Sequence, residues 1–337
     1  MLRAAAAADQ LAILALARAD SLPAFASDGV LSSPEVFSQQ LVTGLSNGMI
    51  IALIAIGYTM VYGIVELINF AHGDLCMLGA FFALTAVGAF ALDGIEGPGG
   101  TAGLVALLLA TAAFCGALNW SINRLAYRPL RSASKLSLLV SAIGASFVLV
   151  NLGLFWGGLP MEVFAGGTSA AAPKAFPALV EPKPAFTVGD VIISRPDVLV
   201  LAVTVPLMLA LTWLVRFTKL GKAMRAVAQN PTAASLMGID VERVIGATFF
   251  IGGALGGFAT VVYSIYNQTV GFQMGYRMGM DAFIAAVLGG LVIGVVRAMS
   301  DGYVEARWTN AIVFGLLILI LVFRPSGLLG AKLREKV

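Results

Sequence analysis

Four polar side chains interrupt the apolar stretch Ser46–Gly79, at positions Glu66, Asn69, His72 and Asp74. His72 is the only histidine of the chain. Polar groups at membrane depth are costly, so they face protein or a water-filled cavity and commonly mark a pathway. We therefore expect this segment to line or shape a route for a solute across a membrane.

The same residues have a local interpretation as well. A helix that begins near Leu75 favours Asn or Asp before its first turn, and Asn69, His72 and Asp74 are placed to cap it. Interrupted helices also line substrate routes in transporters. Capping and pore lining are compatible, so the sequence leaves both open.

Motifs for catalysis are missing from the sequence. There is no G-x-x-x-x-G-K-[ST] loop, because Gly221-Lys222 lacks the upstream glycine, and there is no H-E-x-x-H. One histidine and few acids leave little for acid–base catalysis. Cys76 and Cys115 both lie in apolar runs and give neither a disulfide framework nor a metal spacing. We expect no catalytic residue, no metal and no cofactor.

The composition excludes a soluble domain. Of 337 residues, 59% are hydrophobic and 12% charged, whereas a soluble domain has about 25% charged residues. Mean hydropathy is +0.93. The apolar runs are continuous and about 20 residues long, which favours helices over a barrel. We predict an all-α polytopic membrane protein with about eight transmembrane helices and one or two broken or re-entrant segments.

The chain divides into three parts. Residues 1–36 form an N-terminal extension that is signal-like or poorly ordered. Residues 37–330 form the transmembrane domain, and residues 331–337 a basic tail. The predicted segments are a helix over 38–58, a broken or re-entrant piece over 59–73, and spans over 75–92, 102–123, 137–156, 197–215, 242–266, 281–300 and 308–323.

Charge predicts the orientation. The loops 124–135 and 216–244 are basic and therefore expected on the cytoplasmic side, whereas 157–195 has balanced charges and is expected outside. The basic tail should also be cytoplasmic. If 281–300 and 308–323 were each a full span, the tail would lie outside, so one of them must be incomplete, doubled or re-entrant.

The loop 216–244 carries a second local signal. Asn230-Pro231-Thr232 fits a cap and first turn, which predicts a short helix from Pro231 to Met237. A short amphipathic helix between two spans suits the binding of a partner protein. The alternative is a solvated basic loop that topology alone keeps on this side.

Several motifs together resemble one family. The segments INFAHGD (68–74), AYRPLRSAS (126–134), SAIGASF (141–147) and GKAMRAVAQNPTAASLMGIDVERV (221–244) resemble LivH-type permeases, the membrane subunits of branched-chain amino acid ABC importers. The resemblance covers about residues 37–330. It implies a multi-pass subunit of the bacterial inner membrane that translocates branched-chain amino acids by alternating access and is not itself an enzyme.

The resemblance also implies partners. These are a LivM-like second permease, two cytoplasmic ATPase subunits that hydrolyse ATP, and a periplasmic amino acid binding protein, with membrane lipid around the helices and no nucleic acid. The implied ATPase-coupling loop comprises Gly221, Lys222, Arg225, Ala226, Asn230, Ala233, Ala234, Gly238 and Ile239. The residues expected to line or shape the translocation path are Tyr58, Tyr62, Glu66, Asn69, Phe70, His72, Gly73 and Asp74.

The chain departs from the family pattern after Ala285–Gly290. There the family continues with a Gly-rich, proline-containing turn, whereas this chain runs directly into Leu291-Val292-Ile293-Gly294. This predicts either a shortened re-entrant piece or a degenerate copy.

Two other functions stay open at this point. Urea or short-chain amide ABC permeases share a similar core. A stand-alone secondary transporter would instead use Glu66 and Asp74 as proton or sodium sites, although the sequence shows no paired carboxylates and no internal duplication. Dependence on ATPase subunits distinguishes these classes.

Overall fold

The fold was analysed in a computed structural model that describes residues 34–65, 69–90, 98–131, 133–167, 169–189, 191–304 and 306–323. Most of the predicted N-terminal extension, the predicted basic tail and Glu66 lie outside these described residues. Residues 34–36 belong to the first described helix rather than to the extension.

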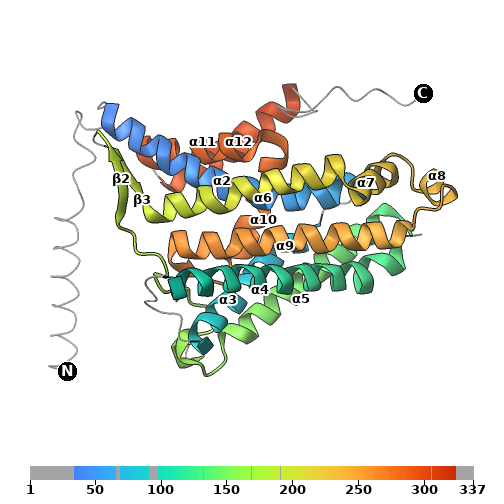
Figure 1. Ribbon diagram of the computed structural model, residues 1–337, viewed down its shortest axis with the longest axis horizontal. Coiled ribbons are helices and arrows are strands. Elements are labelled where there is room, and N and C mark those ends of the chain that lie inside the picture. Colours follow the sequence, from blue (N-terminus) through green and yellow to red (C-terminus); the bar gives the residue numbers. More distant parts are fainter. Residues whose placement is uncertain are drawn as a thin grey trace.

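The described part of the chain is almost entirely helical (Figure 1). Short strands occur only in the connections at one end of the molecule. The α-helices are α2 (Pro34–Val65), α3 (Ala71–Phe90), α4 (Pro98–Ile122), α5 (Lys135–Gly157), α6 (Arg195–Phe217), α7 (Lys219–Gln229), α8 (Pro231–Leu236), α9 (Val241–Asn267), α10 (Met274–Leu288), α11 (Gly290–Tyr303) and α12 (Ala306–Phe323). The short elements are the π-helix Asn123–Tyr127, the 3₁₀ helices Arg128–Leu130 and Glu162–Gly167, and the strands β1 (Lys174–Ala175), β2 (Pro184–Val188), β3 (Val191–Ser194) and β4 (Thr269–Val270).

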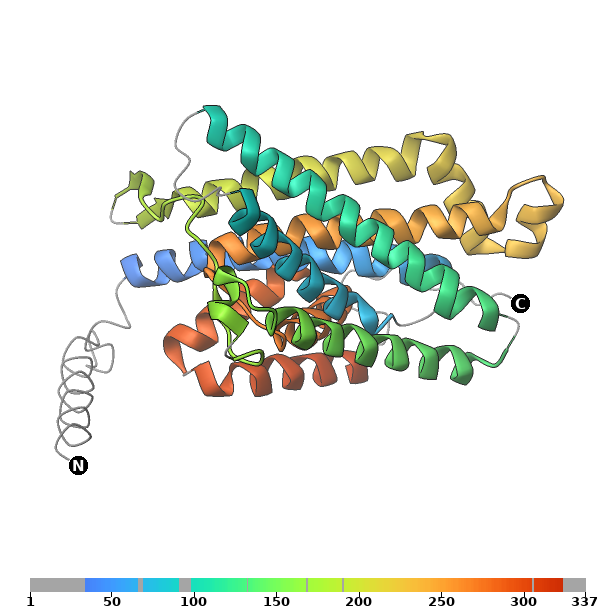
Figure 2. The same ribbon diagram turned by 90° about the horizontal axis from the view of Figure 1, so that it is seen from below.

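Seven of these helical segments are long and apolar enough to cross a membrane, and the bent pair α10 and α11 raises the number to at most eight in the described residues. The predicted fold class is therefore confirmed. Most residues in the apolar 18-residue stretches of α2, α3 and α9 are buried, whereas few of those in α5, α6 and α12 are. Figure 2 shows α3 lying between α4 and α5. The helices α2, α3 and α9 thus form the centre, and the polar cluster of the sequence belongs to it.

The predicted break within the first apolar stretch is misplaced. Helix α2 continues unbroken past residue 58 to Val65, and α3 begins at Ala71 rather than near Leu75. Gly57 does not break α2 because it packs against α9, where a Cβ on Gly57 would lie 2.7 Å from the Gly252 carbonyl oxygen. Small residues at such positions allow membrane helices to approach closely. Gly57 therefore allows α2 to pack closely against α9. Helix α2 ends only at Val65, and helix α3 begins at Ala71.

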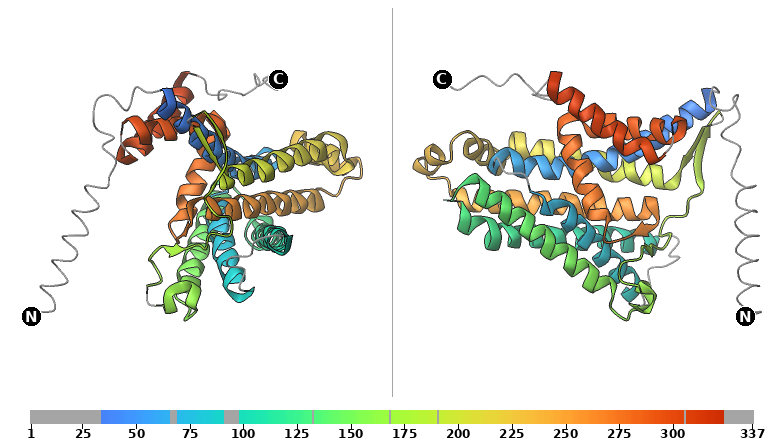
Figure 3. Two further views of the ribbon diagram at one scale, coloured as in Figure 1. Left: turned by 60° about the vertical axis from the view of Figure 1, so that its left-hand side comes forward. Right: turned by 180° about the vertical axis from the view of Figure 1, so that it is seen from behind.

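The run predicted as one span over 281–300 is re-entrant. Helix α10 begins at Met274, before the predicted start of this span at residue 281. It ends at Leu288, and Gly289, which has φ +91°, connects it to α11. The two helices are bent by 116° relative to each other. Figure 3 shows α10 running across the direction of the long helices.

Helix α11 then returns along α2 toward the end from which α10 started. Gly290 lies against Ala52 in the middle of α2, and Gly302 lies against Gln40 near its start. The expectation that one of the last two apolar runs is incomplete, doubled or re-entrant agrees with this bent pair, in which the chain folds back at Gly289 without a longer turn. Helix α12 is then a candidate full span from Ala306 to Phe323.

The two ends of the molecule differ. At the basic end, Glu242 pairs with Arg128 at 3.0 Å and with Arg131, which joins the two basic connections. At the hairpin end, β2 and β3 form an antiparallel hairpin, and β1 pairs with β4 through Lys174 and Val270. Figure 1 shows α8 and the β2–β3 hairpin at opposite ends. This agrees with the predicted separation of the basic loops from 157–195.

Candidate functional site

A cavity of about 420 Å³ lies among α2, α3, α5 and α10. Its walls are mainly apolar, and no Lys, Arg or His among the described residues lines it. The lining residues are Tyr58, Asn69, Phe70, Asp74, Ile143, Ser146, Phe147, Val150, Gly275, Tyr276, Gly279, Met280 and Phe283. The structure therefore brings four of the predicted path residues together, and adds walls from α5 and α10 that the sequence analysis missed.

Asp74 supplies the carboxylate of this cavity. It lies in the first turn of α3 and is 4% exposed. Its Oδ2 accepts a hydrogen bond from the Ser146 hydroxyl, and Ser146 stands midway along α5. A negative charge in the first turn of a helix is favoured by the helix dipole. The carboxylate thus faces the centre of the helical bundle rather than either end.

His72 lies behind the cavity wall and does not line the cavity. Its ring is 1% exposed and meets the Tyr58 ring edge-on, with the ring centroids 5.9 Å apart. Neither ring nitrogen has a hydrogen-bond partner in the described residues. The Ile54 carbonyl approaches the ring without hydrogen-bond geometry. His72 therefore supports the position of Tyr58.

Asn69 ties the start of α3 to α4. Its side-chain oxygen accepts from the Tyr127 hydroxyl at 2.8 Å, and its amide donates to Asn119 at 3.4 Å. Asn119 in turn donates to the Phe249 carbonyl at 2.6 Å. The expectation that these polar side chains cap a helix near Leu75 is wrong, because the helix starts earlier, Asn69 is engaged across the bundle, and His72 and Asp74 lie inside α3.

The other predicted path residues have distinct positions. A Cβ on Gly73 would overlap the backbone of α10 at Gly275 and Gly279, so this glycine sets the close approach that shapes the cavity. Phe70 lines the cavity and is half-exposed, and Tyr62 is exposed on α2 outside it. Glu66 lies outside the described residues.

The cavity is open on one side of the chain. Phe147 and Tyr276, which line it, are 65% and 70% exposed. Both are large aromatic residues on helices of the membrane domain. Exposed apolar side chains of this kind contact either lipid or another protein.

The predicted coupling loop forms a protrusion at the basic end. Helix α7 is followed by α8, and the Asn230 side chain accepts from the Ala233 amide at 3.0 Å as the N-cap of α8. The predicted short helix is confirmed and ends at Leu236, one residue before the predicted end. Gly238 has φ +80°, a conformation that favours glycine, and the chain turns there toward α9.

Some predicted loop residues hold the protrusion, and others are free to contact a partner. Gly221 and Ala234 are buried, and a Cβ on Gly221 would overlap the backbone of α6. The Arg225 guanidinium donates to the Val215 carbonyl. The remaining predicted residues are exposed or partly exposed, namely Lys222, Ala226, Asn230, Ala233, Gly238 and Ile239.

Two residues of the protrusion were not predicted. Leu236 and Met237 are 83% and 82% exposed at the tip of α8. Large apolar side chains this exposed on a polar loop mark a contact surface. The sequence signal was an adjacent Leu-Met pair at the end of a capped helix in an otherwise polar loop.

Charged residues anchor this protrusion to the α4–α5 connection. Glu242, in the first turn of α9, pairs with Arg128 and Arg131, and Arg131 also donates to Asn123 at 2.6 Å. Burial lowers the pKa of the Arg131 guanidinium from its usual value, and the neighbouring Glu242 opposes that shift. The contact links the start of α9 to the end of α4.

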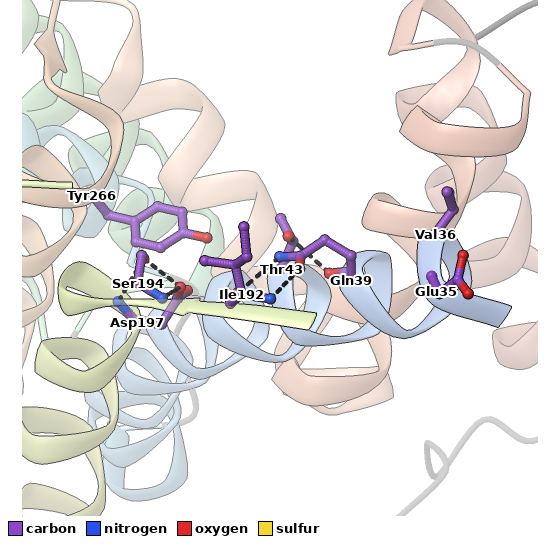
Figure 4. A pocket seen from close by; sticks show the side chains of 8 residues that line it. All are labelled: Glu35, Val36, Gln39, Thr43, Ile192, Ser194, Asp197 and Tyr266. Atoms are coloured by element: carbon purple, nitrogen blue, oxygen red, sulfur yellow. Dashed lines mark hydrogen bonds between the residues drawn. The ribbon is translucent and has the colours of Figure 1, made fainter. Parts of the chain in front are cut away.

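A second pocket, of about 540 Å³, lies at the hairpin end (Figure 4). In it, the Gln39 amide and the Ile192 backbone exchange hydrogen bonds of 3.1 and 2.9 Å. Asp197 accepts from the Ser194 amide at 3.0 Å and from the Ser46 hydroxyl at 2.6 Å. Figure 4 shows Ser194 and Asp197 pointing toward one another and Gln39 against Ile192, whereas Glu35 and Val36 lie apart on the first turn of α2. The pocket thus contains a polar clip between the hairpin, α2 and α6.

Known membrane transport proteins match this chain in sequence. A family model described as "Branched-chain amino acid transport system / permease component" matches residues 40–322. The chain is 37% identical over 320 residues to the permease protein LivH of Salmonella typhimurium, which covers 89% of this chain and 98% of the relative. It is also 37% identical over 320 residues to BraD of Pseudomonas aeruginosa, covering 90% of this chain and all of the relative.

A shorter match, 29% identical over 140 residues, relates the chain to a probable branched-chain amino acid transport permease protein LivM of Methanocaldococcus jannaschii and covers 34% of this chain and 41% of that relative. No solved structure matches significantly. The architecture and the cavity define a multi-pass membrane protein of the transport class. The chain belongs to the family of permease components of branched-chain amino acid transport systems.

Proposed function

We propose that this chain is the permease subunit of an ATP-driven importer that moves branched-chain amino acids across the bacterial inner membrane by alternating access. The observation that carries the proposal is the cavity beside Asp74, which combines one carboxylate with apolar walls at mid-bundle depth. Aliphatic amino acids need that combination of a polar end and an apolar pocket. The family to which the chain belongs supports the same solute class.

The cavity is one half of the translocation path in this proposal. Tyr58, Asn69, Phe70 and Asp74 contact the solute, whereas His72 and Gly73 hold the wall in shape. A urea permease needs no apolar pocket of this extent, which favours amino acids over that alternative. A stand-alone ion-coupled transporter has no use for an exposed apolar protrusion at the basic end.

The protrusion α7–α8 is the contact for a cytoplasmic ATPase subunit. Its exposed tip, Leu236 and Met237, enters the partner, and Gly221 and Ala234 fix the protrusion on α6 and α9. Movement of the ATPase pair then reaches the membrane domain through α9, whose first turn carries Glu242. The chain itself performs no hydrolysis.

A second, LivM-like permease covers the open side of the cavity. Phe147 and Tyr276 would then be buried between the two permeases, which completes the path. The apolar faces of α5, α6 and α12 that remain exposed contact membrane lipid. The hairpin end faces the periplasm and receives an amino acid binding protein, since the basic end is cytoplasmic by its charge.

Co-purification tests this function. The chain is expressed with the reading frames beside its gene, purified by a tag, and assayed for a bound ATPase subunit. The variant Leu236→Ala/Met237→Ala should reduce the recovered ATPase about tenfold or more, because two exposed contact residues are lost. The matched control Phe186→Ala/Val188→Ala removes two exposed apolar side chains of β2 at the opposite end and should leave recovery unchanged.

Two results would overturn the proposal. One is the absence of any ATPase from the purified wild-type chain, which leaves a transporter of another class. The other is equal loss in both double variants, which would show a general defect rather than a contact at α8.

A further inference from the structure

A buried carboxylate stands without a counter-charge in the cavity wall. Asp74 is 4% exposed, and none of the described residues that line the cavity with it is cationic. None of the ion pairs in the part of the chain that the structure describes includes Asp74. A carboxylate in a low-dielectric site is costly, and charged groups in membrane segments either pair or mark the route of a charged solute.

The neighbours of Asp74 offset only part of this cost. The Ser146 hydroxyl donates to Oδ2, and the start of α3 contributes its helix dipole. Neither carries a net positive charge. The carboxylate is therefore held ready for a cation that the described residues do not supply.

The space next to the second carboxylate oxygen is kept free by a glycine. A Cβ on Gly275 would lie 2.5 Å from Asp74 Oδ1, and Gly275 lines the cavity. Any larger residue at 275 would cover this oxygen. Glycine at 275 thus lets α10 approach the turn that carries Asp74 without a side chain against Oδ1.

We propose that Asp74 binds the α-ammonium group of the transported amino acid. This inference rests on the proposed function and assigns the residue within the cavity that recognises the solute. The ammonium group supplies both the missing charge and a donor for Oδ1. A solute with no positive charge, such as urea, would leave Asp74 unpaired.

Tyr58 serves the other polar end of the solute. Tyr58 lines the cavity, and its hydroxyl is buried and has no hydrogen-bond partner in the described residues. A buried donor without an acceptor is costly, and the carboxylate of an amino acid supplies that acceptor. The aliphatic side chain then lies against the apolar walls Phe70, Ile143, Val150, Met280 and Phe283.

Protection of a cavity cysteine from maleimide tests this assignment. Val150→Cys places a thiol in the cavity wall, and the native Cys76 and Cys115 are fully buried and should react slowly. The purified complex of the chain with its co-purifying subunits is incubated with leucine, with 3-methylbutylamine, which lacks the carboxylate, or with 4-methylpentanoate, which lacks the amine. The concentration that halves the labelling rate is the readout.

Leucine and 3-methylbutylamine should protect, and 4-methylpentanoate should not. In the Asp74→Asn background the half-protecting concentration of leucine and of the amine should rise about tenfold or more. Tyr58→Phe should raise it for leucine and leave it unchanged for the amine. Glu35→Gln, which removes an exposed carboxylate at the hairpin end, is the matched control and should change neither.

Three results would overturn the inference: equal protection by 4-methylpentanoate and the amine, unchanged leucine protection in Asp74→Asn, or protection by sodium ions alone. The comparison of the two analogues uses the chain with Asp74 intact, so it tests the binding of the ammonium group even if Asp74→Asn fails to fold. ATP-driven leucine uptake by the wild-type complex is measured separately. Uptake together with unchanged protection in Asp74→Asn overturns only this inference, whereas no uptake by the wild type overturns the proposed function.

Discussion

Gly294 of α11 lies directly on Gly48 of α2. A Cβ on Gly48 would be 3.3 Å from the Gly294 Cα, and a Cβ on Gly294 would overlap the backbone of α2. Small residues at four-residue spacing continue this contact on both helices, through Ala52 and Gly290. The contact fixes the re-entrant segment against the longest helix of the chain and thereby positions α10 at the cavity.

The first prediction concerns this contact. Gly294→Ala should destabilise the protein by about 1–3 kcal/mol, because the added methyl group forces α11 away from α2. Thermal unfolding in detergent measures the effect. Gly315→Ala in α12 is the matched control, since no atom lies within 4 Å of a Cβ at that position. A midpoint for Gly294→Ala equal to that of the control would contradict the described packing.

The second prediction concerns the cap of α8. Asn230→Ala should destabilise the protrusion by about 0.5–2 kcal/mol, because the bond to the Ala233 amide is lost. Hydrogen exchange of the α8 amides should become faster, and recovery of the ATPase subunit should fall. Asn230→Asp should restore both, since a carboxylate accepts the same bond. Failure of this rescue would argue that the Asn230 side chain acts in another way.

The third prediction concerns Glu242. Glu242→Gln should lower leucine-stimulated ATP hydrolysis, with a loss of stability of about 1 kcal/mol or less because the ion pairs are partly exposed. The exchange Glu242→Arg/Arg131→Glu should recover part of the activity. Arg243→Ala removes a more exposed pair with Asp240 and should have little effect. Equal activity of Glu242→Gln and Arg243→Ala would remove Glu242 from the coupling route.

The fourth prediction concerns the clip at the hairpin end. Asp197→Ala should loosen the β2–β3 hairpin, because the Ser194 amide and the Ser46 hydroxyl both lose their acceptor. Hydrogen exchange at Ile192 and Ser194 should accelerate at least about fivefold, in line with a cap worth about 1 kcal/mol. Thr187→Ala, on the exposed strand β2 of the same hairpin, should leave the exchange unchanged. Unchanged exchange in Asp197→Ala would show that the hairpin is held by other contacts.

Local signals in the sequence were sufficient where a feature depends on neighbouring residues. The helix after Asn230 follows from an N-cap and a proline at the first turn, which act within a few residues. An irregular span among the last two apolar runs followed from a count of basic loops, because charge places the ends of spans without any knowledge of packing. The spans themselves follow from continuous apolar runs.

Features that depend on distant contacts could not be predicted in this way. A glycine such as Gly57 within an apolar run suggests a break in the helix when only its neighbours in sequence are considered. Its role is instead set by its contact with Gly252, which lies far along the chain. Asn69 reads as a cap, but its side chain bonds to Asn119 and Tyr127 on another helix. Most of the cavity wall, including Ser146 and Gly275, comes from α5 and α10, and no local signal in these helices connects them with Asp74.

Uptake of radiolabelled leucine into proteoliposomes tests the central claim most directly. The account predicts that the chain, reconstituted with its co-purifying subunits and supplied with binding protein, accumulates leucine only when ATP is present on the basic side of the membrane. It also predicts no uptake by the chain alone under a proton or sodium gradient. Leucine uptake by the chain alone, driven by such a gradient and indifferent to ATP, would contradict the account.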